Sequence, residues 1–156
     1  MLHILCYNYL NLPDSIDFEN DIKIKYLYAS GGAKLRQVTY TNGTPTEQLD
    51  YSGSFVYENS SLKFILTSEG RLILNGSTFE RDYVLSDHLG NTRVIVKKSG
   101  DTAAIVQENH FYAFGMEITD PEHRFSDGSI PNSFLYNGKE YDTNTGYYQY
   151  GFRQYD

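Results

Sequence analysis

The chain has 156 residues, a formal net charge of −7 at pH 7, and an aromatic content of 15 Tyr and 9 Phe with no Trp. The acidic charge repels phosphate backbones and anionic lipid, which argues against binding to nucleic acid or to a membrane surface. A hydrophobic content of 40% is too high for a disordered chain, and no apolar stretch approaches the ~20 residues that span a bilayer. Residues 1–12 lack the basic region and cleavage site of a signal peptide.

Strand signals dominate the sequence. Ile22–Tyr26 alternates apolar and basic residues, and Lys34–Tyr40 alternates again after a Gly-bearing cluster at 29–33, which predicts a β-hairpin. The same unit recurs, with further strands expected at Leu62–Thr67, Arg71–Asn75, Thr78–Ser86, Thr92–Lys98 and Ala104–Ala113. Asn-Gly pairs, the strongest short hairpin signal, occur at 42–43, 75–76 and 137–138.

Helix signals are weak, because no window of a dozen residues has apolar side chains at helical spacing with a cap. Thr119–Asn132 is rich in Asp, Gly, Ser and Pro and is expected to be the longest loop. Met1–Asp21 is ambiguous, and a strand whose partner lies outside the chain is one interpretation. The expected fold is all-β, with about ten short strands in sequential antiparallel hairpins that form a curved sheet, and little helix.

No catalytic, metal or cofactor site is predicted. Ser86-Asp87-His88 contains the residue types of a hydrolytic triad, but adjacent residues do not converge as triad members do, so a turn is the better interpretation. Zinc needs three or four convergent ligands, and calcium loops have a defined spacing. Neither spacing is present among the candidates His3, His88, His110, His123 and Cys6 for zinc, or Asp120, Glu122 and Asp127 for calcium.

Four ordered blocks between residues 83 and 156 resemble one known family. YVLSDHLGNTRV at 83–94 resembles the opening of the RHS repeat-associated core domain, and NHFYAFGM at 109–116 resembles its next block, with Ala113 where the family usually has Pro. FLYNGKEYD at 134–142 and the segment 145–156 resemble the closing blocks, in the form associated with Bacteroidetes. The motif positions, taken as structural, are Asp87, His88, Gly90, Asn91, Arg93, Phe114, Gly115, Asn137, Gly138, Tyr150, Gly151, Arg153, Tyr155 and Asp156.

The resemblance divides the chain into YD-repeat-like hairpins at 1–82 and a core segment at 83–156. In the first part, Asn8 and Ala29 stand where the family's repeats have Asp. The resemblance implies a strip of antiparallel sheet that spirals into a shell around a C-terminal cargo, often a toxin. It therefore implies a structural, non-enzymatic segment whose partners are the rest of the shell and the cargo. It also implies a secreted or cell-envelope location within a larger bacterial protein.

Two other functions stay open. Exposed tyrosines offer apolar faces and hydroxyls, which would suit a carbohydrate- or surface-binding module. The family's core can act as an aspartyl autoprotease, and Arg153 matches the arginine placed near that site. The family's aspartates and DPxG-like cleavage segment follow the YD block and are not in this chain, so a non-cleaving remnant is expected. Self-association is expected through cut sheet edges at Tyr7–Leu12 and Tyr147–Tyr155.

Overall fold

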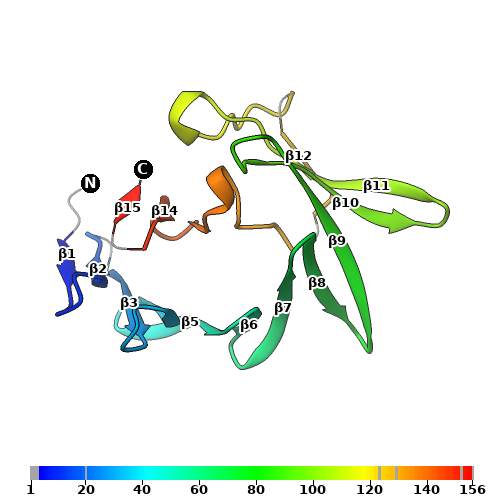
Figure 1. Cartoon of the computed structure of the whole chain (residues 1–156). Helices are drawn as coiled ribbons and strands as arrows, with labels where there is room; N and C mark the ends of the chain where they lie inside the picture. The colour runs from blue at the N-terminus through cyan, green and yellow to red at the C-terminus, as the bar shows by residue number, and fades with distance from the viewer. Residues whose placement is uncertain (1–3, 20, 123, 129, 152, 156) are drawn as a thin grey trace. The chain divides into compact units, whose positions relative to one another are not determined.

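The computed structural model describes residues 4–19, 21–122, 124–128, 130–151 and 153–155, and the chain is all-β (Figure 1). Twelve strands form a single sheet in strictly sequential order from β1 to β12, and three more strands form a separate small sheet. Within the described ranges, no helix is long and apolar enough to cross a membrane. The chain divides into two compact units, residues 1–66 with 151–153 and residues 67–150 with 154–156, which are described in turn.

The first unit is a run of antiparallel hairpins. Its strands are β1 (Ile4–Tyr7), β2 (Pro13–Asp17), β3 (Ile22–Tyr28), β4 (Lys34–Thr41), β5 (Thr44–Ser52), β6 (Phe55–Glu58) and most of β7 (Ser61–Thr67). The predicted alternation in β3 is confirmed, because Ile24 and Tyr26 are buried whereas Lys25 is exposed. Ile24 and Tyr26 form a small apolar core with Ile16 of β2.

The N-terminal segment differs from one of its interpretations. β1 pairs with β2 in register Leu5↔Ile16, so its strand partner lies within the chain. Residues 8–12 form the turn between these strands, and the edge of the sheet is Ile4–Tyr7 instead of Tyr7–Leu12. The side chain of Asn8 accepts backbone hydrogen bonds that close the chain into a turn at this point.

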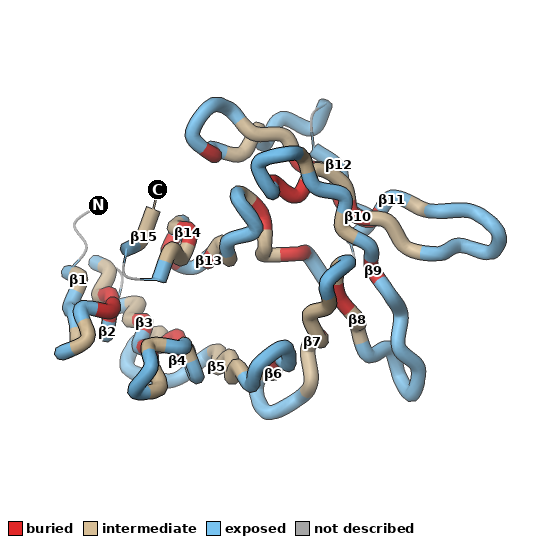
Figure 2. The backbone as a smooth tube through the Cα atoms, viewed as in Figure 1, coloured by how far each residue is buried: buried red, intermediate tan, exposed pale blue. Residues whose placement is uncertain are grey.

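The second unit continues the hairpins and then adds loops and the small sheet. Its elements are β8 (Gly70–Asn75), β9 (Thr78–Ser86), β10 (Thr92–Ser99), β11 (Thr102–Glu108), η1 (Ala113–Gly115), β12 (Phe125–Ser126), η2 (Tyr136–Gly138), β13 (Tyr141–Asp142), β14 (Tyr147–Gln149) and β15 (Gln154–Tyr155). Figure 2 shows short buried stretches on the strands and in the segment that follows β12. The two 3₁₀ turns agree with the expectation of little helix, and fifteen described strands replace the expected ten or so.

Two predicted strands are too long. The strand expected at Ala104–Ala113 ends at Glu108, because Asn109 turns its buried side chain to the backbone of Thr92 and the chain then enters a loop. The C-terminal strand expected at Tyr147–Tyr155 is interrupted at Gly151, whose φ of 75° reverses the chain. The strand β14 therefore lies between β13 and β15, and it is not the edge that was expected to drive self-association.

The three Asn-Gly pairs fold in three ways. Asn42 and Gly43 both have positive φ and join β4 to β5, as predicted. Asn75 instead ends β8 opposite Thr78, so that the two-residue turn is 76–77. Asn137-Gly138 lies in a loop closed by a single bridge between Phe134 and Glu140 and not in a hairpin between two long strands. The Asn-Gly dipeptide therefore predicted correctly that the chain reverses direction at each site. It did not predict which two residues form the turn.

Candidate functional site

The first part of the site is a turn at residues 87–91 that is closed by its own hydrogen bonds. The carboxylate of Asp87 accepts hydrogen bonds from the backbone N–H groups of Leu89 and Asn91 at 2.9 and 3.0 Å, and from the Asn91 side-chain amide at 2.8 Å. Desolvation favours the neutral acid, but the hydrogen bonds from Asn91 and Leu89 outweigh it and lower the pKa of Asp87 below its ordinary value. The carboxylate is thus committed to holding the turn, as expected from Ser86-Asp87-His88.

The loop at residues 134–140 rests on this turn. The backbone N–H of Asn137 donates to Asn91 Oδ1 at 2.9 Å, and Thr92 donates both its N–H and its hydroxyl to the carbonyls of Leu135 and Phe134. A Cβ built on Gly90 would lie 3.8 Å from the backbone of Asn137, so the two turns are in close backbone contact. Motif residues from two distant blocks are therefore brought together.

A second loop at residues 111–117 repeats the geometry of the loop at 134–140. Both loops read Phe-x-x-x-Gly-x-Glu and both are closed by a bridge between the Phe and the Glu. Both place two consecutive residues at positive φ, with Phe114 at 69° and Asn137 at 50° before the glycine. The repeat was not predicted from the sequence, although it is visible when the two segments are aligned with a shift of 23 residues.

Tyrosine rings join the two loops. Tyr136 lies between Phe111, Tyr148 and Tyr155, and is stacked on Tyr155 at 13° with ring centroids 6.2 Å apart. A Cβ on Gly115 would fall 2.5 Å from the Tyr136 ring, so only glycine fits at residue 115. The hydroxyl groups of Tyr148 and Tyr155 donate to the carbonyls of Gly115 and Phe114. Burial strongly raises the pKa of Tyr148, so its hydroxyl stays protonated as a donor.

The cluster leaves little for a glycan to bind. Tyr150 accepts a hydrogen bond from Asn137 at 3.1 Å, so the hydroxyls of Tyr148, Tyr150 and Tyr155 are all engaged within the protein. Their rings also pack on one another instead of forming an exposed platform. A tyrosine surface beside convergent polar groups, which would favour carbohydrate binding, is not found in this cluster.

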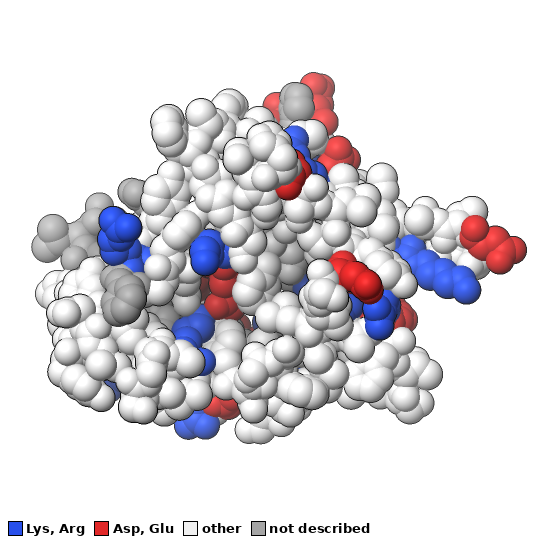
Figure 3. All heavy atoms as spheres, viewed as in Figure 1, with Lys and Arg blue, Asp and Glu red and all other residues white. Residues whose placement is uncertain are grey.

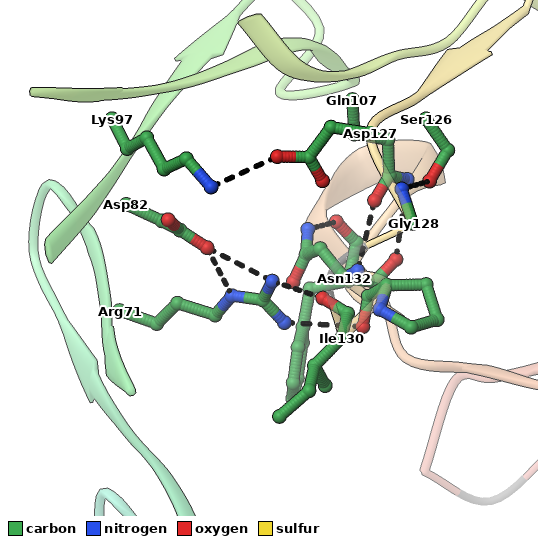
Figure 4. Close-up of polar contacts among 11 residues, drawn as sticks. Arg71, Asp82, Lys97, Gln107, Ser126, Asp127, Gly128, Ile130 and Asn132 are labelled. Carbon is green, nitrogen blue, oxygen red and sulfur yellow. Dashed lines mark hydrogen bonds and ion pairs between the residues drawn. The ribbon is translucent and has the colours of Figure 1, made fainter. Parts of the chain in front are cut away.

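A buried arginine fastens the segment after β12 to the sheet (Figure 4). Arg71 and Asp82 are 1% and 3% exposed and form an ion pair at 2.9 Å. The same guanidinium donates to the carbonyls of Ile130 and Pro131. Burial lowers the pKa of Arg71, and the carboxylate of Asp82 opposes that change. The ion pair joins β8 to β9, and the arginine holds residues 130 and 131 against these two strands.

Other polar contacts extend this attachment, as Figure 4 shows. Gln107 accepts a hydrogen bond from the backbone N–H of Asn132 at 2.9 Å and donates to the Asn109 side chain at 2.8 Å. Lys97 donates to Asp127 at 2.9 Å. This network was not predicted from the sequence. The signal was present, because a turn at 76–77 places the opposite charges of residues 71 and 82 directly across the hairpin.

The remaining motif positions play separate parts. His88 is exposed in its turn, and Arg93 donates to Nδ1 of His110, whose other ring nitrogen lies 3.0 Å from Glu108. Gly151 and Arg153 belong to the other compact unit, and Arg153 is exposed just before β15 instead of lying in a strand. Asp156, like His3 and His123, lies outside the described residues. Among the described residues, no group of three or more His, Cys, Asp or Glu could hold a metal.

No protein-family model matches the chain, and no curated protein matches it in sequence. Solved structures do resemble its fold. It aligns with the crystal structure of TcdB2-TccC3 at a TM-score of 0.73 and 17% identity, over 99% of this chain and 8% of that chain. The form of TcdB2-TccC3 without its hypervariable C-terminal region gives the same values. The Photorhabdus luminescens Tc holotoxin pore gives a TM-score of 0.68 at 17% identity, again over 99% and 8%.

At this level of identity the likeness establishes the fold alone. The chain reproduces, nearly from end to end, a segment that makes up 8% of each of these much longer chains. The shared fold is therefore an array of sequential antiparallel hairpins that these long proteins also contain.

Proposed function

We propose that this chain is a non-catalytic structural segment of the β-shell of a bacterial RHS protein, where the shell encloses or displays a C-terminal cargo such as a toxin. The fold likeness carries the proposal, because 99% of this chain matches while only 8% of the larger chain is used. If this chain is one segment of the wall, it should match a small part of a large β structure along its whole length. The four ordered motif blocks at 83–156 support the same family.

The site supports a structural role for the motif. The side chains of Asp87 and Asn91 form hydrogen bonds within the turn and to the loop at 134–140. The rest of the shell and the cargo are the partners proposed, in a secreted or envelope protein. The Bacteroidetes origin rests on the form of the closing motifs. The division of the chain at residues 82 and 83 stays a prediction of the same resemblance.

The proposal is tested on the full product of the gene that encodes this chain, imaged by cryo-electron microscopy. A hollow β-structure with residues 4–155 in its wall is the expected map. A gene product without further hairpin repeats, or a map without a lumen, would contradict the proposal. A matched preparation that lacks the region after residue 156 would show whether density inside the lumen belongs to a C-terminal cargo.

The non-catalytic part of the proposal has its own test. We expect the chain to remain a single species by intact-mass spectrometry on prolonged incubation with protease inhibitors. Arg153→Ala serves as the control, because Arg153 matches the arginine of the family's cleavage site. A discrete truncation of the parent chain that disappears in Arg153→Ala would identify a residual autoprotease instead.

A further inference from the structure

The loop at 112–116 presents apolar side chains that folding has left in water. Tyr112, Phe114 and Met116 are 55%, 80% and 66% exposed, and the residues from 111 to 116 carry no charge. Scattered exposed apolar residues are ordinary, but three on one tight loop are a candidate interaction surface. Residues 112–116 are called the aromatic knob. In Figure 3 the surface at the upper left, where Figure 1 places this yellow loop, has no coloured charges.

The matching loop at 134–140 shows what a loop of this shape binds. The carbonyls of Phe134 and Leu135 accept hydrogen bonds from the hydroxyl and the backbone N–H of Thr92, at 2.8 and 3.0 Å. The backbone N–H of Asn137 donates to the side chain of Asn91 at 2.9 Å. These three bonds fasten the loop to the hairpin turn at 87–91, which is therefore its partner within the chain.

The two loops have the same internal hydrogen bonds, so their backbone groups correspond one to one. In each loop the second residue donates its N–H to the carbonyl of the sixth, at 2.8 Å from Tyr112 and at 3.0 Å from Leu135. The glycine in the fifth place donates to the carbonyl of the second residue, at 3.2 Å from Gly115 and at 3.4 Å from Gly138. The carbonyls of residues 111 and 112 and the N–H of residue 114 thus correspond to the three groups that bind the turn at 87–91.

In the aromatic knob these groups are available. Among the residues that the structure describes, none donates to the carbonyl of Phe111 and none accepts from the N–H of Phe114. The carbonyl of Tyr112 accepts the bond from Gly115 and has a second lone pair, which Leu135 uses at the same place in its own loop. The knob is therefore a second copy of a turn-binding loop, and its turn is not among the described residues.

The aromatic knob is also held in the conformation that binding would need. Phe114 has a φ of 69°, which is an outlier for a bulky residue. The hydroxyl groups of Tyr148 and Tyr155 donate to the loop carbonyls, and the Tyr136 ring lies against Gly115. Because the loop is already ordered, a partner would lose little free energy in fixing it.

The other turns of this kind in the chain cannot supply the missing bonds. The turns at 8–12 and 29–33 have the same backbone bonds as the turn at 87–91. In place of Asn91, however, they have Leu12 and Ala33, whose side chains accept no hydrogen bond. In place of Thr92 the first of them has Pro13, which has neither an N–H nor a hydroxyl. A second copy of the chain is unsuitable for the same reasons, since its own turn at 87–91 is already occupied.

We propose that the aromatic knob binds a further hairpin turn of the kind seen at 87–91, supplied by a segment of the parent protein outside residues 1–156. This inference rests on the proposed function, because a larger shell is the source of such a segment. The solved structures with this fold are long enough to contain many more hairpins, since the chain matches only 8% of their length.

The chemistry of the partner turn follows from the correspondence. It carries an asparagine at the position of Asn91, which accepts from the N–H of Phe114, and a serine or threonine at the position of Thr92, which donates to the carbonyls of residues 111 and 112. An apolar side chain beside them covers the Phe114 ring. A lipid bilayer is a less suitable partner, because its hydrocarbon would leave these backbone groups without hydrogen bonds.

Photocrosslinking of the full gene product identifies the partner. We expect p-benzoylphenylalanine in place of Phe114 to capture a hairpin turn outside residues 1–156, with Asn and Ser or Thr at the positions of Asn91 and Thr92. Mass spectrometry of the crosslinked peptides locates the captured residue. The same replacement at Tyr9, which is 86% exposed in the other compact unit, is the matched control and should not capture that turn.

Hydrogen exchange tests the proposed bond itself. The N–H of Phe114 should exchange at least about tenfold more slowly in the full gene product than in this chain alone, because it gains a hydrogen bond there. The N–H of Asn137 is bonded within the chain, so it should exchange slowly in both samples and serves as the internal reference. Mass spectrometry with fragmentation of the exchanged peptides resolves the two positions.

Failure of this inference can be told apart from failure of the proposed function. In a gene product that forms a hollow β-structure, capture of the C-terminal cargo, of a second copy of residues 1–156, or of nothing by residue 114 would overturn the inference alone. Equally fast exchange of the Phe114 N–H in both samples would have the same meaning. A gene product without a hollow β-structure would instead contradict the proposed function, and this inference with it.

Discussion

The side-chain carbonyl of Asn91 accepts a hydrogen bond from the backbone N–H of Asn137 at 2.9 Å, joining two turns that lie 46 residues apart. The same side chain donates to Asp87 within its own turn. Asn91 is 5% exposed, so neither bond can readily be replaced by water. This residue therefore connects the hairpin array to the loops that follow it.

Asn91→Ala should lower the free energy of unfolding by about 2–4 kcal/mol, because it removes both bonds and leaves a partly buried N–H without a partner. Urea denaturation followed by circular dichroism measures the change. His88→Ala alters an exposed neighbour in the same turn and should change stability by less than ~0.5 kcal/mol. Equal losses in the two variants would show that the turn, and not the long-range bond, controls stability.

Ala29→Asp should stabilise the protein. The turn at 29–33 has the same backbone bonds as the turns at 8–12 and 87–91, but Ala29 stands where Asn8 and Asp87 cap the backbone. The new carboxylate would accept two N–H groups and add about 0.5–1.5 kcal/mol. Ser30→Asp adds the same charge without the capping geometry. Thermal unfolding should place Ala29→Asp above the parent and above this control.

Arg71→Met should be severely destabilising, by about 3–5 kcal/mol, because it leaves the buried carboxylate of Asp82 without its cation. Arg71→Met with Asp82→Leu should recover part of the loss, since the unpaired charge is gone. Arg36→Met breaks an ion pair whose arginine is 47% exposed and should cost under ~1 kcal/mol. Guanidinium unfolding of the parent and the three variants completes the comparison. If the double variant has a lower free energy of unfolding than Arg71→Met, this account is wrong.

The pKa of Asp87 is lowered in the folded state, so its hydrogen bonds favour folding when the carboxylate is charged. That contribution is complete above the ordinary pKa of 3.8 and is lost as the pH falls through the lower, folded-state pKa. Asp87→Asn should therefore be less stable than the parent at pH 7, and the difference should shrink in acid. Melting temperatures between neutral and strongly acidic pH test this, with Asp101→Asn as the control.

Much of the hairpin array follows from local sequence, because each strand pairs with its neighbour in the chain and short turns set the register. The alternation in β3 and the Asp87 turn are examples that pattern alone predicts. The contact of Asn91 with Asn137 could not be predicted in this way, because it depends on the chain leaving β12 and returning across the sheet. The exposure and positive φ of Phe114 could not be predicted from the sequence pattern either, because an apolar run normally predicts burial.

The strictly sequential strand order has a consequence for synthesis. A hairpin needs only the residues on either side of its turn, so β1 to β11 can form one after another while the chain leaves the ribosome. The bonds from Asn91 and Arg71 to residues 130–137 can form only after those residues have emerged. During translation the sheet would therefore form hairpin by hairpin, and its bonds to residues 130–137 would form last. A nascent chain stalled before residue 130 should carry hairpins that proteases can still cleave.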